Sequence, residues 1–155
     1  MMLSIDAGKH GGAALFTNDG RLAGTYQFDM PPEPRFPHFD DMKSFMNWIP
    51  PTLTTLVAIE ALPDYRTVGH VKHKNTQGAV WGVQYASAII RCNPDEVEVV
   101  EARLWKKHFG LGSDKKEALA LARSMYPDLP EIQLEKQDGV AEAILIGHYI
   151  YDTTN

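Results

Sequence analysis

Four acidic residues stand where an apolar segment begins or ends, and their types and spacing are suited to binding metal ions. Asp6 ends the apolar run 2–5, and Glu60 interrupts the apolar run 56–62. Asp138 and Glu142 are four residues apart, which places both on one face at the start of a helix. Carboxylate oxygens are the ligands that Mg²⁺ takes, and two such ions about 3.5–4 Å apart promote phosphodiester hydrolysis. The sequence therefore predicts a two-metal hydrolytic site.

Each of these carboxylates also has a purely structural interpretation. Asp6 precedes glycines and could belong to a turn, Glu60 could point to solvent, and Asp138 could cap a helix. Capping does not account for Glu142, which lies one position past a capping box in an otherwise apolar helix. A carboxylate among apolar residues needs a partner or a shifted pKa, so we expect a cation near Glu60 and a buried or cleft-edge Glu142.

The remaining residues exclude several other chemistries. Cys92 is the only cysteine, so the chain has no disulfide and no Cys-rich zinc site, which fits a reducing cytosol. No glycine-rich phosphate loop and no serine nucleophile elbow are present. Asp6 and Lys9 interrupt the apolar N-terminus, which predicts neither a signal peptide nor a membrane span. We expect a cytoplasmic protein that starts near Met1.

The charge balance is acidic, which argues against binding nucleic acid through bulk charge. The formal net charge is −5, with 20 acidic and 15 basic residues. Basic residues nevertheless cluster locally, at 70–74, 103–108 and 115–116. An acidic protein can therefore still carry a basic face, although each cluster could equally be solvated surface charge.

Apolar patterning predicts the elements that must position these residues. Runs at 2–6, 12–17 and 21–28 around the turn Asn18-Asp19-Gly20 predict a three-stranded antiparallel meander, and the prolines of 31–37 predict a surface loop. The other predicted elements are a helix at 40–48, a strand at 56–62, a helix at 76–91, a strand at 97–100, and helices at 114–125 and 139–151. This order predicts one α/β domain over 1–155, with a mixed five-stranded sheet and helices on both faces.

Several segments resemble the ribonuclease H-like fold, and specifically RuvC-type Holliday-junction resolvases of the phage-like branch. They are LSIDAG at 3–8, VAIEAL at 57–62, NTQGAVWG at 75–82, RLWKKHFGLGSDKKEALALARSMYP at 103–127 and KQDGVAEAILIGHY at 136–149. The resemblance covers most of the chain. It implies a homodimeric endonuclease that cuts branched DNA, above all four-way junctions, with two Mg²⁺ per active site, for which Mn²⁺ would substitute.

The same resemblance assigns roles to individual residues. The metal ligands and catalytic groups would be Asp6, Glu60, Asp138 and Glu142. Bacterial members usually space the last pair by three, whereas the spacing of four found here resembles the phage-like version. The DNA contacts would be Tyr65, Arg66, Lys72, His73, Lys74, Lys106, Lys107, Lys115 and Lys116, and the residues near the dimer interface would be Gly78, Trp81, Gly82 and Tyr85. The alternatives are a flexible solvated loop after Glu60 and a glycine-rich helix packed within one subunit.

Two other functions are compatible with this fold. One is a ribonuclease H that acts on RNA–DNA hybrids, and the other is a branched-DNA-binding module without catalysis, to which the acidic net charge gives weight. Sugar kinases with a similar first hairpin need two domains, for which 155 residues leave no room. If a phage encodes the protein, its expected location is the cytoplasm of the bacterial host.

Overall fold

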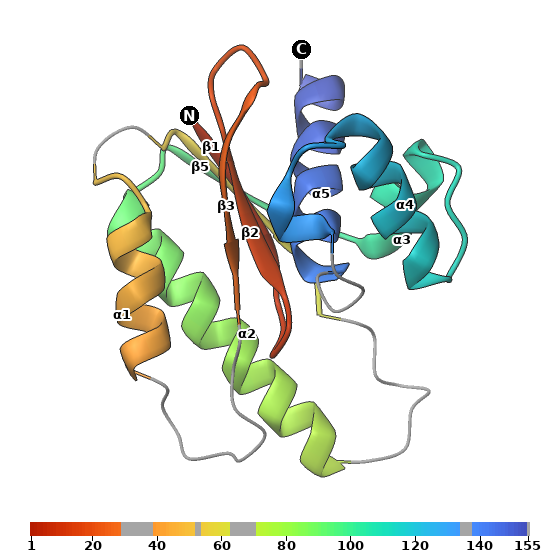
Figure 1. The fold of residues 1–155 in the computed structure, drawn as a ribbon. Helices are drawn as coiled ribbons and strands as arrows, with labels where there is room; N and C mark the ends of the chain where they lie inside the picture. The colour runs from red at the N-terminus through yellow and green to blue at the C-terminus, as the bar shows by residue number, and fades with distance from the viewer. Residues whose placement is uncertain (29–38, 52–53, 63–70, 134–137, 155) are drawn as a thin grey trace.

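A mixed five-stranded sheet forms the centre of the structure, a computed structural model (Figure 1). The strands are β1 (Met2–Asp6), β2 (Gly12–Phe16), β3 (Leu22–Gln27), β4 (Leu56–Glu60) and β5 (Glu96–Val100). Their order is β3-β2-β1-β4-β5, with β1, β2 and β3 antiparallel and β1, β4 and β5 parallel. The predicted meander and the mixed sheet are therefore confirmed.

The structure describes only part of the chain. The described residues are 1–28, 39–51, 54–62, 71–133 and 138–154, and for residues 39 and 71–76 only the backbone is described. The predicted proline-rich loop at 31–37 lies outside these ranges.

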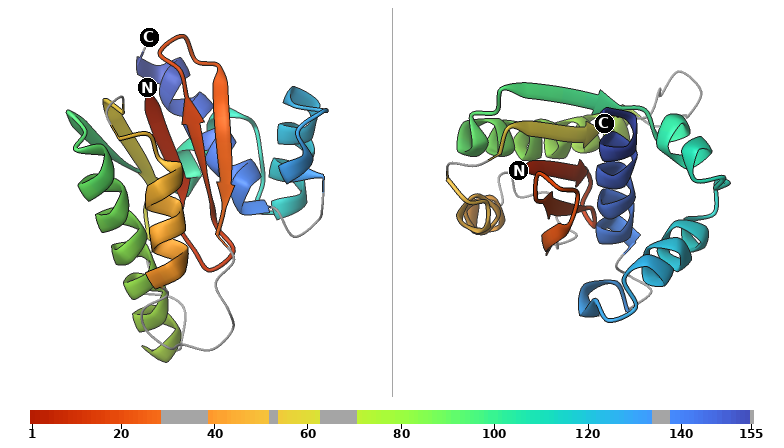
Figure 2. Two further views of the ribbon diagram at one scale, coloured as in Figure 1. Left: turned by 60° about the vertical axis from the view of Figure 1, so that its left-hand side comes forward. Right: turned by 90° about the horizontal axis from the view of Figure 1, so that it is seen from above.

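Helices cover both faces of the sheet, as the sequence predicts. They are α1 (Phe39–Trp48), α2 (Val71–Cys92), α3 (Ala102–His108), α4 (Lys115–Met125), the 3-10 helix η2 (Pro130–Ile132) and α5 (Asp138–Thr154). Helices α1 and α2 lie on one face and α5 on the other, with α3 and α4 beyond α5 (Figures 1 and 2). Among the helices described, none is long and apolar enough to cross a membrane.

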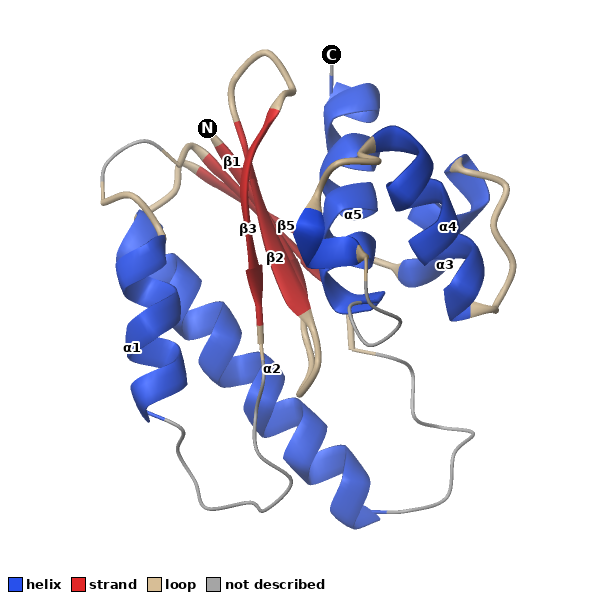
Figure 3. Cartoon of the chain, viewed as in Figure 1, coloured by secondary structure: helices blue, strands red, loops and turns tan. Residues whose placement is uncertain are grey.

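The sheet separates two apolar clusters, and Figure 3 shows the helical layers that complete them. One cluster joins the α5 face of the sheet to α3 and α4, and it contains Phe16, Trp105 and Ile144. The other joins the opposite face to α1 and α2, and it contains Ile5, Phe45 and Ile59. Because β1 and β4 are covered on both faces, their sequences are almost wholly apolar until the final residue of each strand.

The helices differ from the sequence-based prediction at α3, at the start of α2 and at the short η2, which was not predicted. Helix α3 was not predicted, because it is seven residues long and buries a single side chain, Trp105, which leaves no apolar periodicity to recognise. Helix α2 begins at Val71, five residues before the predicted start at Thr76. The added residues are mostly polar, so apolar spacing does not reveal this first turn.

Helix α5 begins in backbone contact with the turn between β1 and β2, and glycine is required there. Gly11 and Gly139 form an isolated parallel bridge. A Cβ on Gly139 would lie 2.3 Å from the carbonyl oxygen of His10, and one on Gly12 would lie 2.5 Å from the nitrogen of Val140. These contacts bring the first turns of α5 to the edge of the sheet at which β1 ends.

We expect Gly139→Ala to lower the free energy of unfolding by about 1–3 kcal/mol, because the new methyl group would push against backbone atoms that cannot rotate away. The control is Gly24→Ala in β3, where the nearest atom to a new Cβ would be Cζ2 of Trp48 at 3.6 Å, an ordinary van der Waals contact. Urea unfolding at one protein concentration compares the two. Equal stabilities of the two variants would contradict the proposed contact.

Candidate metal centre

Three of the four candidate carboxylates lie on three different elements at one edge of the sheet. Asp6 ends β1 and Glu60 ends β4, and the parallel register that pairs Ile5 with Ile59 brings these two ends side by side. Glu142 lies in the first turns of α5, whose backbone meets the turn after β1. The hydroxyl of Ser4 also donates to the carbonyl oxygen of Ala143 at 2.7 Å, which ties β1 to this part of α5.

The pKa of Asp6 reflects both its burial and the other carboxylates near it. It is raised well above its ordinary value, first by burial and then by repulsion from Glu142 and Glu60, with a smaller contribution from Asp138. Lys115 opposes these effects and lowers the pKa. All four predicted carboxylates therefore share one electrostatic environment, in which Asp138 has the weakest influence on Asp6.

Glu60 has an indole, and not a cation, as its direct hydrogen-bond partner. The Nε1–H of Trp105 donates to Oε2 of Glu60 at 2.9 Å. Burial raises the pKa of Glu60, the Trp105 hydrogen bond lowers it, repulsion from Glu142 raises it, and Lys106 and Lys115 lower it. The expected positive charge is thus present and acts electrostatically, while a neutral donor makes the contact.

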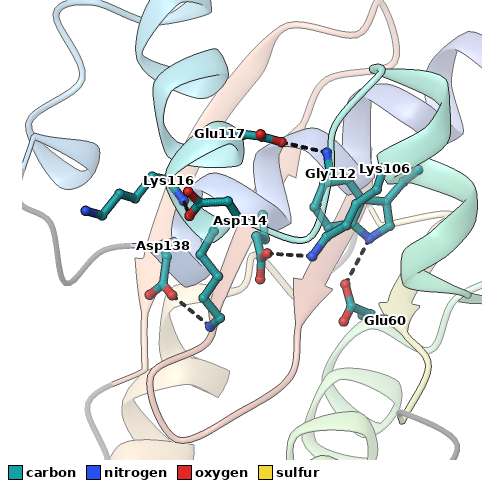
Figure 4. Close-up of polar contacts among 10 residues, drawn as sticks. Glu60, Lys106, Gly112, Asp114, Lys116, Glu117 and Asp138 are labelled. Carbon is teal, nitrogen blue, oxygen red and sulfur yellow. Dashed lines mark hydrogen bonds and ion pairs between the residues drawn. The ribbon is translucent and has the colours of Figure 1, made fainter.

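Glu142 is buried, as its place in an apolar helix predicts, with 4% of its surface exposed. Its Oε1 atom lies 3.3 Å from Nζ of Lys106 but makes no hydrogen bond of good geometry. Asp138 is more accessible, and its Oδ2 accepts a hydrogen bond from Nζ of Lys115 at 2.8 Å. Figure 4 shows Lys106, Glu60 and Asp138 with these contacts as dashed lines.

Two lysines that the sequence suggested as DNA contacts are directed at the carboxylates. Lys106 pairs with Glu142 and Lys115 with Asp138. Burial lowers the pKa of Lys115, but Asp138, Glu142 and Asp6 raise it further, so the net shift is upward. Both ammonium groups are therefore local counter-charges, and a contact of either with DNA stays a prediction.

The donor set fits a hard divalent cation. Carboxylate oxygens are the preferred ligands of Mg²⁺, and Oε1 of Glu142 is buried without a hydrogen bond. A cation would also relieve the repulsion that raises the pKa of Asp6. In their present positions, no three acidic, histidine or cysteine side chains among the described residues form a metal shell. The ammonium groups of Lys106 and Lys115 supply part of the counter-charge instead.

The other predicted DNA contacts are only partly described. Tyr65 and Arg66 lie outside the described residues, and Lys72, His73 and Lys74 belong to the first turns of α2, where only the backbone is described. Lys107 of α3 and Lys116 of α4 are exposed, as contacts to a phosphate backbone would require.

Of the predicted interface residues, the two glycines lie on an uncovered strip of α2, whereas the two aromatic residues pack against the core. A Cβ at Gly78 or Gly82 would meet no atom within 4 Å, so this strip of α2 is open. The rings of Trp81 and Tyr85 stack with their centroids 4.9 Å apart, and both pack against the apolar cluster between the sheet and helices α1 and α2. The indole of Trp81 also donates to the carbonyl oxygen of Glu60 at 2.8 Å. Trp81 thus has a role within the subunit, and the dimer stays a prediction.

Sequence analysis missed two residues that organise this site. Trp105 holds the carboxylate of Glu60. Gln84, fully buried in α2, accepts from the nitrogen of Gly8 at 3.1 Å and donates to its oxygen at 3.0 Å, which fixes the backbone just after Asp6. For Gln84 the only available signal was a polar residue within the predicted helix 76–91, and that signal does not identify a partner. Trp105 lies in a helix that was not predicted.

Comparison with known proteins shows the fold. Neither a protein-family model nor a curated protein sequence matches the chain. Thermus thermophilus RuvC in complex with a Holliday junction substrate is 14% identical, with a TM-score of 0.63 over 99% of this chain and 95% of that chain. A second structure of Thermus thermophilus RuvC is 16% identical, with a TM-score of 0.59 over 98% of this chain and 95% of that chain. The chain therefore has the RuvC form of the ribonuclease H-like fold, which confirms the predicted fold class.

We expect Asp6→Asn to stabilise the protein at neutral pH in EDTA. Because the pKa of Asp6 is raised on folding, stability is lost as the pH rises from the ordinary pKa of 3.8 through the raised pKa of the folded state. Asparagine carries no such penalty, so its advantage should vanish near pH 4. With saturating Mg²⁺ at neutral pH, the unaltered chain should instead be more stable than Asp6→Asn, because a cation that binds only the folded state stabilises the chain that keeps its ligand.

Urea unfolding across this pH range, with and without Mg²⁺, measures these effects. Asp128→Asn makes the same change of charge at an exposed position, and it should shift stability little under any of the conditions. If Asp6→Asn and Asp128→Asn have the same stability in EDTA, neither burial nor the neighbouring carboxylates penalise the charge of Asp6.

Proposed function

We propose that this chain is a metal-dependent endonuclease that resolves four-way DNA junctions and cuts related branched DNA. One observation carries the proposal: Asp6, Glu60 and Glu142, from three separate elements, meet at one edge of the sheet, where their carboxylates repel one another. The fold that brings them together is shared with a RuvC whose structure contains a Holliday junction substrate. Buried carboxylates that repel one another cost stability, so their presence together favours a role in binding cations.

The cluster would hold two divalent cations, Mg²⁺ or Mn²⁺. Asp6, Glu60 and Glu142 are the ligands favoured by their burial and coupling, and Asp138 completes the set from the start of α5. When bound, such ions stabilise the charge that develops during in-line displacement at a phosphate. Asp6 and Glu60 end their strands side by side, which presents both carboxylates to one phosphodiester.

Lys106 and Lys115 would change partners when cations and DNA bind. In the structure they balance the charge of Glu142 and Asp138. With those carboxylates bound to cations, Lys106 and Lys115 would be free to contact the scissile strand. Further DNA contacts are proposed at the exposed Lys107 and Lys116, and at Tyr65, Arg66, Lys72, His73 and Lys74.

Symmetric cleavage of a junction needs two active sites, and we propose a homodimer for this reason. The open strip at Gly78 and Gly82 on α2 is compatible with a close approach of a second helix. The spacing of four between Asp138 and Glu142 favours the phage-like type of resolvase. The proposed location is the cytoplasm, which would be that of the bacterial host if the protein comes from a phage.

The first experiment compares cleavage of a labelled four-way junction, a linear duplex, a fork and an RNA–DNA hybrid with Mg²⁺, Mn²⁺ or EDTA. We expect paired nicks in the junction with either metal and none in EDTA, and a sedimentation mass near twice 17.3 kDa. Preference for the hybrid would identify a ribonuclease H. Binding without cutting would favour the non-catalytic module, which the net charge of −5 also supports.

We expect Glu60→Gln to reduce junction cleavage by about 100-fold or more while junction binding stays within about twofold. A lost metal ligand removes several kcal/mol of charge stabilisation, and about 1.4 kcal/mol is a factor of ten in rate. The basic residues that contact phosphates are unchanged, so affinity should persist. Single-turnover cleavage and a gel-shift titration measure the two quantities.

Glu131→Gln provides the matched control, since it makes the same change at an exposed position in η2. It should cleave as fast as the unaltered chain. Full activity of Glu60→Gln in Mg²⁺ would contradict the proposed role of Glu60 as a metal ligand.

A further inference from the structure

Two tryptophans hold Glu60 from opposite faces of the sheet. Trp81 of α2 donates its indole N–H to the backbone carbonyl of Glu60 at 2.8 Å. Trp105 of α3 donates its indole N–H to Oε2 of the Glu60 side chain at 2.9 Å. The two rings belong to the two different apolar clusters that the sheet separates. Both the backbone and the carboxylate of Glu60 are therefore restrained.

Trp105 is a rigid donor. Its ring is fully buried, and it is the single buried side chain of the seven-residue helix α3. An indole N–H can only donate, so it selects one carboxylate oxygen, Oε2, and leaves the other to different partners. The terminal torsion of a glutamate is broad, and without this donor the carboxylate would rotate more freely.

The same helix also reaches a second carboxylate. Nζ of Lys106 lies 5.0 Å above the ring of Trp105 and 3.3 Å from Oε1 of Glu142. A cation above an indole face is attracted to it, so the ring that orients Glu60 also steadies Lys106. Consecutive residues of α3 thus connect β4 with α5 across the acidic cluster.

We propose that Trp105 is a positioning residue, which holds the carboxylate of Glu60 in the arrangement that receives a divalent cation. A phenylalanine would fill most of the same space, but only the indole N–H reaches Oε2 of Glu60. Hydrogen bonds from outside the ligand shell orient metal-binding carboxylates, and their loss typically weakens metal binding by about 10–100-fold. The inference rests on the proposed function, because it requires the acidic cluster to bind metal.

The test is the affinity of the full chain for Mn²⁺ alone, measured from the electron paramagnetic resonance signal of free Mn²⁺. Trp105→Phe should bind Mn²⁺ about 10–100-fold more weakly. In cleavage of the junction, kcat should fall at sub-saturating metal while the KM for DNA stays unchanged. A residue that only stabilised the fold would not separate metal affinity from DNA affinity in this way.

Trp48→Phe is the matched control. Trp48 is half-buried on α1, where its ring packs near Tyr26 and Phe45 on the far face of the sheet from Trp105. The substitution removes the same atoms and leaves a similar void, and it should leave Mn²⁺ affinity unchanged.

A second measurement leaves Trp105 itself unaltered and decides the question if Trp105→Phe does not fold. The chain has three tryptophans, so its ¹H–¹⁵N spectrum has three indole signals, of which Trp48→Phe and Trp81→Phe identify two. The Trp105 signal should move on Glu60→Gln and on titration with Mg²⁺, while the Trp48 signal stays in place.

Each outcome decides between the proposals. Weaker Mn²⁺ binding by Trp105→Phe alone, with a Trp105 signal that responds to Mg²⁺, supports the inference. Equal Mn²⁺ binding by Trp105→Phe and the unaltered chain, or a Trp105 signal that ignores Glu60→Gln, overturns it and leaves the proposed function standing. If the unaltered chain binds no Mn²⁺, both proposals fall together.

Discussion

Repulsion among carboxylates at one sheet edge is the interaction on which the rest of the site depends. Asp6, Glu60 and Glu142 come from elements far apart in the sequence. Folding buries Asp6 and brings the other two carboxylates near it, and both effects raise its pKa. Like charges in a poorly hydrated setting destabilise the folded state unless opposite charge or hydrogen bonds compensate. Lys106, Lys115 and the indole of Trp105 provide that compensation in the structure.

The fold can tolerate this local cost because apolar packing holds the edge in place from both sides. Strands β1 and β4 are buried on both faces, so their relative register cannot shift to separate Asp6 from Glu60. The contact of Gly139 with the turn after β1 likewise prevents α5 from moving away. The acidic cluster is therefore preorganised by the core and not by its own contacts.

The ion pairs of Lys106 and Lys115 help to reconcile an acidic protein with the proposed DNA substrate. Net charge acts over long range and is screened by salt, whereas contact with a phosphate depends on charges within a few ångströms. Lys106 and Lys115 stand at the carboxylates themselves, where bound cations would replace them as counter-charge. Exposed Lys107 and Lys116 follow them in sequence, so the same two helices, α3 and α4, carry further positive charge.

The sequence alone determined the sheet and the candidate carboxylates, because both leave local signals. Alternating apolar runs and turns predicted the five strands, and an acidic residue within an apolar run is visible without any structure. Only the tertiary structure decided which groups face those carboxylates. Trp105 lies 45 residues from Glu60, and the short helix that carries it has no apolar repeat. Residue spacing encodes neighbours along one element, whereas the partners of a buried charge are set by how separate elements pack.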